Sequence, residues 1–348
     1  MVTITNEIEK ELASYLQSNN YDRIFAVTDE NTQRECLPLL QTVLNQYDTQ
    51  VVTIEAGDVN KDIRQVVKIW EALTNGGASR NSLLVNIGGG MVTDLGGFAG
   101  ATFKRGIHNL NIPTTLMAAV DAAIGGKTGV NFGGLKNEIG SFYQPDCVMI
   151  DCCFLRTLDR KNMLSGYAEM LKHGLISDKE TYYKTIIFDT AKPDYDELTD
   201  LVSDSVAIKE RIVKADPRER GVRKALNFGH TIGHALESLS FSKNTPVLHG
   251  LAVAAGLVCE LYLSHKICDL PIEYLRHTAN FIRDQYPIIS IGCKDYDAIK
   301  EFMRHDKKNE GDSINFTLLA EIGDIRINQQ VEDYLLNEAL DFYRDNNC

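Results

Sequence analysis

The stretch Asn86-Ile-Gly-Gly-Gly-Met-Val-Thr-Asp94 decides the fold of this chain. It completes the apolar run Ser82–Ile87, so that an apolar segment leads into three glycines and then into a helix-like segment. This order predicts a strand, a tight turn and a helix. Glycines let backbone N–H groups approach a ligand closely, and the positive end of the following helix favours phosphate oxygens. A glycine triplet alone, however, is equally typical of an ordinary tight turn.

Further polar and glycine-rich groups follow before Phe142 and favour the phosphate interpretation. They are Lys104-Arg105-Gly106, Pro113-Thr114-Thr115, Val120-Asp121, Gly125-Gly126-Lys127-Thr128-Gly129 and Lys136-Asn137. Tight turns alone do not require so many glycines, hydroxyls and cations. We therefore expect residues 86–142 to form a surface that binds phosphate groups.

The composition restricts the class of protein. With 348 residues the chain is long enough for two domains, and 44% hydrophobic and 24% charged residues are ordinary for a globular protein. The net charge of −12 argues against a nucleic-acid surface, which needs clustered cations. We identify no apolar stretch near the roughly 20 residues of a membrane span. The eight cysteines show no paired CxxC spacing, which favours free thiols in a reducing cytoplasm over a cysteine–zinc site.

Apolar runs alternate with helical patterns in the first half of the chain. This alternation predicts a mostly parallel sheet with helices on both faces. The first run ends at Asp29-Glu-Asn31, a place where open α/β sheets bind ligands, although an ordinary loop also fits. The expected strands are 23–28, 51–55, 83–87, 109–112 and 147–151, and the expected helices are 4–16, 32–44, 61–73, 94–103 and 116–122.

Helical periodicity dominates after about Leu158, with few strand signals. We therefore place a domain boundary near Asp159 and predict an α/β domain at 1–158 and an α-helical domain at 159–348. The expected helices of the second domain are 162–176, 197–215, 224–238, 251–267, 271–286, 295–306 and 331–343.

The segment Gly229-His-Thr-Ile-Gly-His234 carries two histidines at helical i, i+4 spacing. On a helix they share one face, which suits a divalent metal such as zinc. Glu169 and His249, both in apolar settings, are candidates for the remaining ligands. The alternative is two helix histidines that hydrogen-bond to backbone or solvent.

Two charged segments have a surface and a functional interpretation. The run Lys209–Arg223 is typical of a solvated face, but it leads directly to Asn227 and His230, so its cations could line the same cavity. The cluster Asp306-Lys-Lys-Asn309 is by default a surface feature.

Together these motifs resemble the 3-dehydroquinate synthase family of the shikimate pathway, over about residues 29–323. The resemblance implies an NAD-binding, Rossmann-like α/β domain followed by an α-helical metal-binding domain, with the active site between them in a homodimer. The matching motifs are GGGMVTDLGGF (88–98), KRGI (104–107), PTTLMAAVDAAIGGKTGVN (113–131), KNEIGSFYQP (136–145), GYAEMLK (166–172), RERGVRKALNFGHTIGHALE (218–237) and LHG (248–250).

The resemblance assigns the metal ligands to Glu169, His230 and His249, with zinc or cobalt as the metal. His234 then faces the substrate instead of the metal and transfers protons together with Glu219. Asp121 and Lys172 complete the implied catalytic set.

The resemblance also assigns the cofactor and substrate contacts. The implied NAD contacts are Asp29, Asn31, Asp58, Lys61, Gly88, Gly89, Gly90, Met91, Asp94, Thr114, Thr115, Lys127, Lys136 and Thr157. The implied substrate is 3-deoxy-D-arabino-heptulosonate 7-phosphate (DAHP), bound by Arg105 (offered across the dimer), Asp121, Lys127, Asn137, Lys172, Lys209, Arg223, Asn227, His234, His249 and Lys307, the last not separable from Lys308.

Three alternative functions remain. Other sugar-phosphate cyclases, of the 2-epi-5-epi-valiolone or 2-deoxy-scyllo-inosose synthase type, act on substrates without a carboxylate and would leave Lys209 and Arg223 without an anion. A metal-dependent oxidoreductase of the glycerol dehydrogenase kind would not need the phosphate-binding cations. A non-enzymatic module with a nucleotide pocket would need neither the metal ligands nor the proton-transfer residues.

Overall fold

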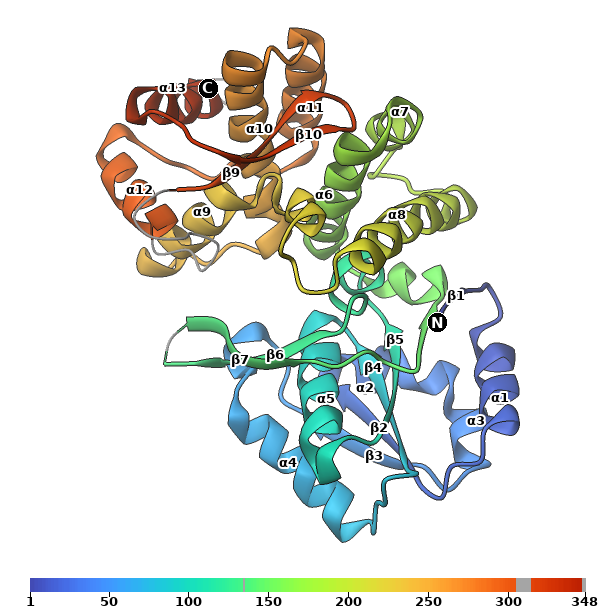
Figure 1. Cartoon of the computed structure of the whole chain (residues 1–348). Coiled ribbons are helices and arrows are strands. Elements are labelled where there is room, and N and C mark those ends of the chain that lie inside the picture. The colour runs from blue at the N-terminus through green and yellow to red at the C-terminus, as the bar shows by residue number, and fades with distance from the viewer. Residues whose placement is uncertain (134, 305–313, 346–348) are drawn as a thin grey trace. The chain divides into compact units, whose positions relative to one another are not determined.

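The computed structural model describes residues 1–133, 135–304 and 314–345 (Figure 1). The chain divides into two compact units. Unit 1 comprises Met1–Asp159 and Tyr195–Val206, and unit 2 comprises Arg160–Asp194 and Ala207–Cys348.

A six-stranded sheet forms the centre of unit 1, with the strand order β1-β8-β5-β4-β2-β3. Every pair of neighbouring strands is parallel, which confirms the predicted α/β class. In their order across the sheet the strands are β1 Val2–Ile4, β8 Cys147–Ile150, β5 His108–Pro113, β4 Leu83–Gly88, β2 Ile24–Asp29 and β3 Gln50–Ile54.

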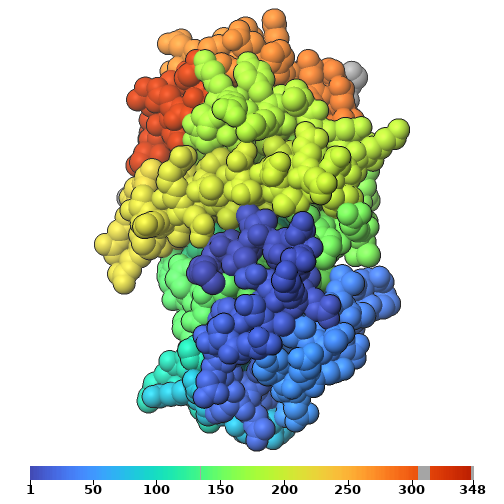
Figure 2. Space-filling model, turned by 90° about the vertical axis from the view of Figure 1, so that its right-hand side faces the viewer, coloured from blue at the N-terminus to red at the C-terminus, as the bar shows by residue number. Residues whose placement is uncertain are grey.

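Helices cover both faces of this sheet, as its continuous apolar strands require. Alternate residues of β4 point to opposite faces: Val85 packs in the core beneath α1 and α3, and Leu84 packs beneath α4 and α5 (Figure 1). The start of the chain, drawn in dark blue, lies at the surface of unit 1 (Figure 2). The helices are α1 Ile8–Ser18, α2 Glu30–Glu35, α3 Gln41–Asn45, α4 Ile63–Asn75 and α5 Gly90–Thr102.

At the carboxyl edge of the sheet, the glycine turn lies beside a second polar turn. Gly88 at the end of β4 pairs in register with Pro113 at the end of β5, and the Thr114 N–H donates to the Gly88 carbonyl at 3.0 Å. Since the carboxyl ends of parallel strands meet at one edge, the glycine turn and Thr114-Thr115 form a common ligand-facing surface.

Helix α5 packs unusually close to the sheet over three buried asparagines. The Asn86 side-chain amide donates to Asn109 at 2.5 Å and to Asn111 at 2.8 Å. A Cβ on Gly96 of α5 would overlap the Asn86 side chain. The glycines of this helix therefore allow a polar layer between helix and sheet, immediately before the glycine turn.

An antiparallel hairpin stands apart from the main sheet of unit 1. Its strands β6 Lys127–Phe132 and β7 Leu135–Phe142 pair with each other. The sequence pattern did not predict these strands, because their motifs are dominated by glycine and charge. The hairpin carries the predicted ligand-binding residues Lys127, Lys136 and Asn137.

Unit 2 is predominantly helical, as predicted, but it also contains a small antiparallel sheet. The pair β9 Phe316–Glu321 and β10 Asp324–Gln329 was missed. Its inward residues Phe316, Leu318 and Leu319 belong to the core of the helical unit. The helices are α6 Arg160–Ser177, α7 Lys179–Ile187, α8 Tyr195–Ala215, α9 His230–Ser242, α10 His249–Cys268, α11 Ile272–Gln285, α12 Tyr296–Arg304 and α13 Asp333–Asp345, with the first part of α8 assigned to unit 1.

Three of the predicted helices differ from the structure. The chain begins with a strand, because Val2–Ile4 pairs with β8 before α1 starts. The predicted helix 32–44 is broken by the 3-10 turn Leu37–Leu39, where Pro38 removes a backbone donor. The predicted helix 224–238 is interrupted at Gly229, which has a left-handed backbone (φ 78°), so that α9 begins at His230.

Helix α10 is long and apolar enough to cross a membrane by length and composition, which the sequence analysis did not recognise. In the structure, 72% of its most apolar window is buried. Leu251, Val253 and Leu257 are part of the core of unit 2. The hydropathy of α10 is thus that of a core helix.

Candidate active site

The start of α5 provides the anion-binding end that the glycine triplet predicted. Gly89 is the N-cap residue, and it has no side chain with which to cap this helix. The first backbone N–H groups of a helix lack intrahelical partners, and the helix dipole makes this end positive. A Cβ on Gly89 would lie 3.0 Å from the Thr115 Cγ2 atom, so the turn lies directly against the second polar loop. These features fit a dinucleotide pyrophosphate.

Lys61 connects two other predicted ligand-binding residues of unit 1. It is 5% exposed, and its Nζ atom lies 2.5 Å from the Asp94 carboxylate and contacts the Asn137 side-chain oxygen. Burial raises the pKa of Asp94, and the neighbouring Lys61 cation opposes this shift. Beside this group Lys136 forms an ion pair of 2.7 Å with Asp58. Asn137, expected at the substrate, therefore contacts a residue expected at the cofactor.

The remaining predicted residues of unit 1 lie on turns and helix ends. Asp29 caps α2 by accepting from the Thr32 N–H at 2.8 Å, and Asn31 lies within that helix. Arg105 is exposed and has a left-handed backbone (φ 67°). Asp121 lies in the π-type turn Ala118–Ala122, and Thr157 ends the 3-10 helix Cys152–Thr157.

Four side chains from three helices of unit 2 converge on one point. His230 and His234 come from α9, His249 comes from the start of α10, and Glu169 comes from the middle of α6. The ring centroids of the histidines lie 5.3–5.5 Å apart. The Glu169 Oε1 atom lies 3.4 Å from His230 Nε2 and 3.6 Å from His249 Nε2. The three imidazoles could hold a metal ion together, and Glu169 adjoins two of them.

The electrostatics of this cluster fit a bound cation. Glu169 is fully buried, and its Oε1 atom makes no hydrogen bond within the described residues. Burial alone would raise the pKa of Glu169, but Lys172 and His230 hold it well below its usual value. Burial alone would lower the pKa of His249, but the neighbouring Glu169 and Glu237 carboxylates raise it to about 10. The site therefore strongly favours positive charge, and imidazole with carboxylate is a typical zinc or cobalt donor set.

Glu237 is a site residue that the sequence analysis did not identify. Its Oε2 atom lies 3.1 Å from His249 Nδ1, so the carboxylate orients the imidazole whose Nε2 faces Glu169. A carboxylate behind a histidine ligand is a common arrangement that fixes the tautomer. The helical spacing of His234 and Glu237 was the available signal, but it does not reveal His249 as the partner.

The other predicted residues of unit 2 are buried or bind a neighbouring side chain. Lys172 contacts the Glu169 carboxylate one helical turn away. Lys209 and Arg223 are 4% and 2% exposed, which is unusual for cations. The Asn227 side chain donates to Glu219 at 2.9 Å, so these two predicted residues lie together. Lys307 and Lys308 lie outside the described residues.

A tight loop holds Glu219 in its position. The Asp216 carboxylate accepts hydrogen bonds from the backbone N–H groups of Arg220, Gly221 and Arg223 at 2.7–3.2 Å. Glu219 itself has a left-handed backbone (φ 57°), which costs energy for a residue other than glycine and is typical of functional sites. Asp216, which the sequence analysis did not single out, therefore holds the backbone of the loop that carries Glu219.

Replacement of Asp216 by alanine is expected to lower kcat by about tenfold or more, with a smaller effect on KM, because Glu219 is predicted to transfer protons and its displacement would slow the chemical step. Steady-state kinetics on the proposed substrate would measure both constants. Asp189→Ala is a matched control, since Asp189 similarly accepts from the Ala191 and Lys192 N–H groups in a loop without predicted site residues. A kcat of Asp216→Ala equal to that of the control would contradict this assignment.

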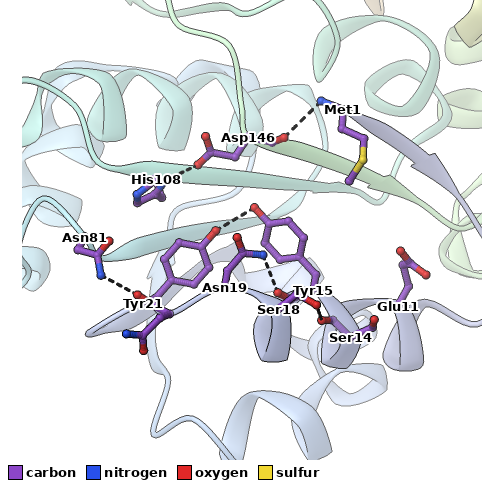
Figure 3. A pocket seen from close by; sticks show the side chains of 11 residues that line it. Met1, Glu11, Ser14, Tyr15, Ser18, Asn19, Tyr21, Asn81, His108 and Asp146 are labelled. Atoms are coloured by element: carbon purple, nitrogen blue, oxygen red, sulfur yellow. Dashed lines mark hydrogen bonds and ion pairs between the residues drawn. The ribbon is translucent and has the colours of Figure 1, made fainter.

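A separate pocket of about 580 Å³ lies at the opposite edge of the sheet in unit 1 (Figure 3). It is lined by Tyr15, Tyr21, His108 and Asp146, and His108 and Asp146 lie at the starts of β5 and β8. The Tyr15 and Tyr21 hydroxyls hydrogen-bond to each other at 2.9 Å, and His108 Nδ1 lies 2.8 Å from Asp146. The pocket lies at the amino edge of the sheet, and these polar groups bind one another. It is therefore distinct from the glycine-turn site at the carboxyl edge.

Comparison with solved structures identifies the class of fold. A 2-deoxy-scyllo-inosose synthase complexed with carbaglucose-6-phosphate, NAD+ and Co2+ has a TM-score of 0.86 at 21% identity, covering 99% of this chain and 96% of that one. The 2-epi-5-epi-valiolone synthase from Streptomyces hygroscopicus subsp. jinggangensis 5008, with NAD+ and Zn2+ bound, has the same TM-score at 23% identity and the same coverage. The fold is that of the sugar-phosphate cyclases.

Sequence comparison identifies the family within this class. Models of the 3-dehydroquinate synthase N-terminal and C-terminal regions match residues 51–165 and 166–309. The 3-dehydroquinate synthase of Parabacteroides distasonis is 59% identical over 344 residues, which cover 99% of this chain and 98% of that protein. The chain belongs to the 3-dehydroquinate synthase family.

Proposed function

We propose that this chain converts DAHP to 3-dehydroquinate and phosphate, as an NAD- and metal-dependent carbon–oxygen lyase of the shikimate pathway. The observation that carries the proposal is the buried Glu169 carboxylate facing two imidazoles. Membership of the 3-dehydroquinate synthase family selects DAHP from the substrates of the cyclase class.

The chemistry proceeds without net oxidation. Oxidation of the C5 hydroxyl acidifies the neighbouring C6–H, phosphate leaves, the C5 ketone is reduced again, and the opened ring closes to a carbocycle. NAD supplies the hydride acceptor and is regenerated in each turnover, while the metal supplies a Lewis acid for the C4 and C5 hydroxyls. Glu169, His230 and His249 would hold the metal, and the glycine turn with Asp94, Lys61 and the other predicted contacts would hold NAD.

Proton transfer is assigned to His234 and Glu219. His234 lies on the same face of α9 as His230, with ring centroids 5.3 Å apart. This proximity supports a role for His234 beside the proposed metal ligands, although it is not one of the three. Glu219 is held by the strained loop and by Asn227. Asp121 and Lys172 complete the proposed catalytic set, with Lys172 also balancing the charge of Glu169.

Two groups of cations would bind the two ends of DAHP. Lys209 and Arg223, which are 4% and 2% exposed, are proposed for the carboxylate as charge-assisted donors. Arg105, Lys127 and Asn137 are proposed for the phosphate, as charge-assisted and amide donors. The exposure of Arg105 suits a residue that a homodimer would offer to the site of the partner subunit.

The test is phosphate release from DAHP with a divalent metal and an amount of NAD well below the amount of substrate. Sedoheptulose 7-phosphate, which lacks the carboxylate, is the matched control substrate. We expect turnover of DAHP far beyond the NAD supplied, with the product identified by coupling to a dehydratase that forms an ultraviolet-absorbing enone. Turnover of only the control sugar would instead assign the chain to the valiolone-type cyclases. Accumulation of NADH would assign it to the dehydrogenases.

The domain assignment, assembly and location are part of this proposal. We assign NAD binding to residues 1–158 and metal and substrate binding to 159–348, in a cytoplasmic homodimer that binds neither nucleic acid nor membranes. Sedimentation analysis of the purified protein, and exchange of Arg105 variants between subunits, would test the homodimer and the shared site.

A further inference from the structure

A fully buried carboxylate on α10 caps the neighbouring helix α9. The Glu260 Oε2 atom accepts a hydrogen bond from the Gly229 N–H at 2.7 Å, and its Oε1 atom accepts from the Ile232 N–H at 3.1 Å. Gly229 and Ile232 are the N-cap and third residues of α9. Glu260 therefore performs for α9 the role that a serine or aspartate N-cap normally performs for its own helix.

The close approach of the two helices explains why the cap comes from outside α9. Gly229 has a left-handed backbone, and a Cβ there would lie 2.6 Å from the Leu257 Cδ2 atom of α10. A Cβ on Gly256 would overlap the Gly229 carbonyl. Since no capping side chain fits at position 229, the N-terminal donors of α9 are bound by a residue one helical turn further along α10.

This cap acts on the residues that carry the imidazoles. His230 is the first residue of α9, its Nδ1 atom lies 3.1 Å from the Phe228 carbonyl, and its Nε2 atom lies 3.4 Å from Glu169. The backbone around Gly229 thus determines the direction of the His230 ring. His249 begins α10, the same helix that carries Glu260, so Glu260 links the two helices that supply the histidines.

The charge of Glu260 matters as well as its hydrogen bonds. The N-terminal end of a helix is positive, equivalent to roughly half an elementary charge, and repels a nearby cation. A metal held by His230 would lie beside this end of α9. A buried anion on the same N–H groups offsets that repulsion, whereas a neutral amide would not.

We propose that Glu260 is a positioning residue for the metal centre, which holds His230 in its ligand geometry and neutralises the N-terminal end of α9. The inference rests on the metal site of the proposed function. A positioning residue of this kind differs from a purely structural cap in one respect. Removal of its charge should weaken metal binding, in addition to lowering the stability of the fold.

The experiment compares Glu260→Gln with Asp178→Ala in the full chain. Asp178 is the N-cap of α7 in the same unit, where it accepts from the Thr181 N–H at 2.9 Å. We expect both variants to unfold at lower denaturant concentration, while only Glu260→Gln binds Zn2+ about tenfold more weakly in chelator competition. The visible absorption of bound Co2+ should change in Glu260→Gln and remain that of the unsubstituted protein in Asp178→Ala.

Two results would overturn the proposal. One is a Zn2+ affinity and a Co2+ spectrum of Glu260→Gln equal to those of the unsubstituted protein, and the other is an equal loss of affinity in Asp178→Ala. If Glu260→Gln does not fold, Glu260→Asp is measured in the same way, because the shorter side chain withdraws from the Gly229 and Ile232 N–H groups. Both readouts are taken without substrate, so failure of DAHP turnover would be seen separately.

Discussion

Replacement of His230 by alanine is expected to remove the bound metal and to lower DAHP turnover by at least about a thousandfold, since Lewis-acid stabilisation is worth several kcal/mol. The His230 ring lies 5.3 Å from the rings of both His234 and His249. Its Nε2 atom also adjoins the buried Glu169 oxygen.

Metal analysis of the dialysed protein and kinetics with added Zn2+ or Co2+ would measure this effect. His277→Ala is the control, because His277 is exposed on α11 of the same unit. It should retain both metal and activity. If His230→Ala kept its metal and its turnover, the ligand assignment of Glu169, His230 and His249 would be wrong.

The double substitution Lys209→Ala with Arg223→Ala is expected to raise the KM for DAHP by about a hundredfold or more. A hydrogen bond to a charged group contributes about 1.5–3 kcal/mol, and the substrate carboxylate would lose two such donors. Both cations are almost fully buried, so that water screens their interactions little. Arg223 is also oriented by its own chain, since its Nη1 atom donates to the Pro217 carbonyl at 2.8 Å.

The matched control is Arg211→Ala with Arg218→Ala, which removes two exposed cations from the same segment. This control should leave the KM unchanged, and denaturant unfolding of both double variants would separate binding from stability. If the KM for DAHP stayed at the value of the unsubstituted protein, the assignment of Lys209 and Arg223 to the carboxylate would be wrong. The phosphate contacts and the metal ligands would not be affected by that result.

Local patterns predicted the elements whose formation depends on neighbouring residues. The strand ending at Gly88, the glycine turn and the helix after it were read from one stretch, because apolar runs, glycines and helical spacing act within a few residues. The hairpins β6–β7 and β9–β10 and the strand β1 were missed. The strand β1 depends on pairing with the distant strand β8. The two hairpins pair within themselves, but the motifs of β6–β7 are dominated by glycine and charge, and β9–β10 is stabilised by packing in the core of unit 2.

The candidate site was only partly predictable from the sequence. Spacing placed His230 and His234 on one helix face, with Glu169 and His249 as candidates for the remaining ligands. The family resemblance then assigned the metal to Glu169, His230 and His249. Neither indicated Asp216, Glu237 or Glu260. These carboxylates act on backbone groups or on a second imidazole, so their function depends on which helix ends lie beside them.

The sequence by itself thus determined the parallel sheet, the phosphate-type turn, the helical second half and the family. These properties follow from local periodicity and from motifs that consist of residues close together in the sequence. Only the tertiary structure decided the close crossing of α9 and α10 at Gly229 and Gly256, and with it the cap from Glu260 and the direction of His230. The physical reason is that helix crossings depend on the volume and hydrogen bonding of residues far apart in the chain, which no single segment contains.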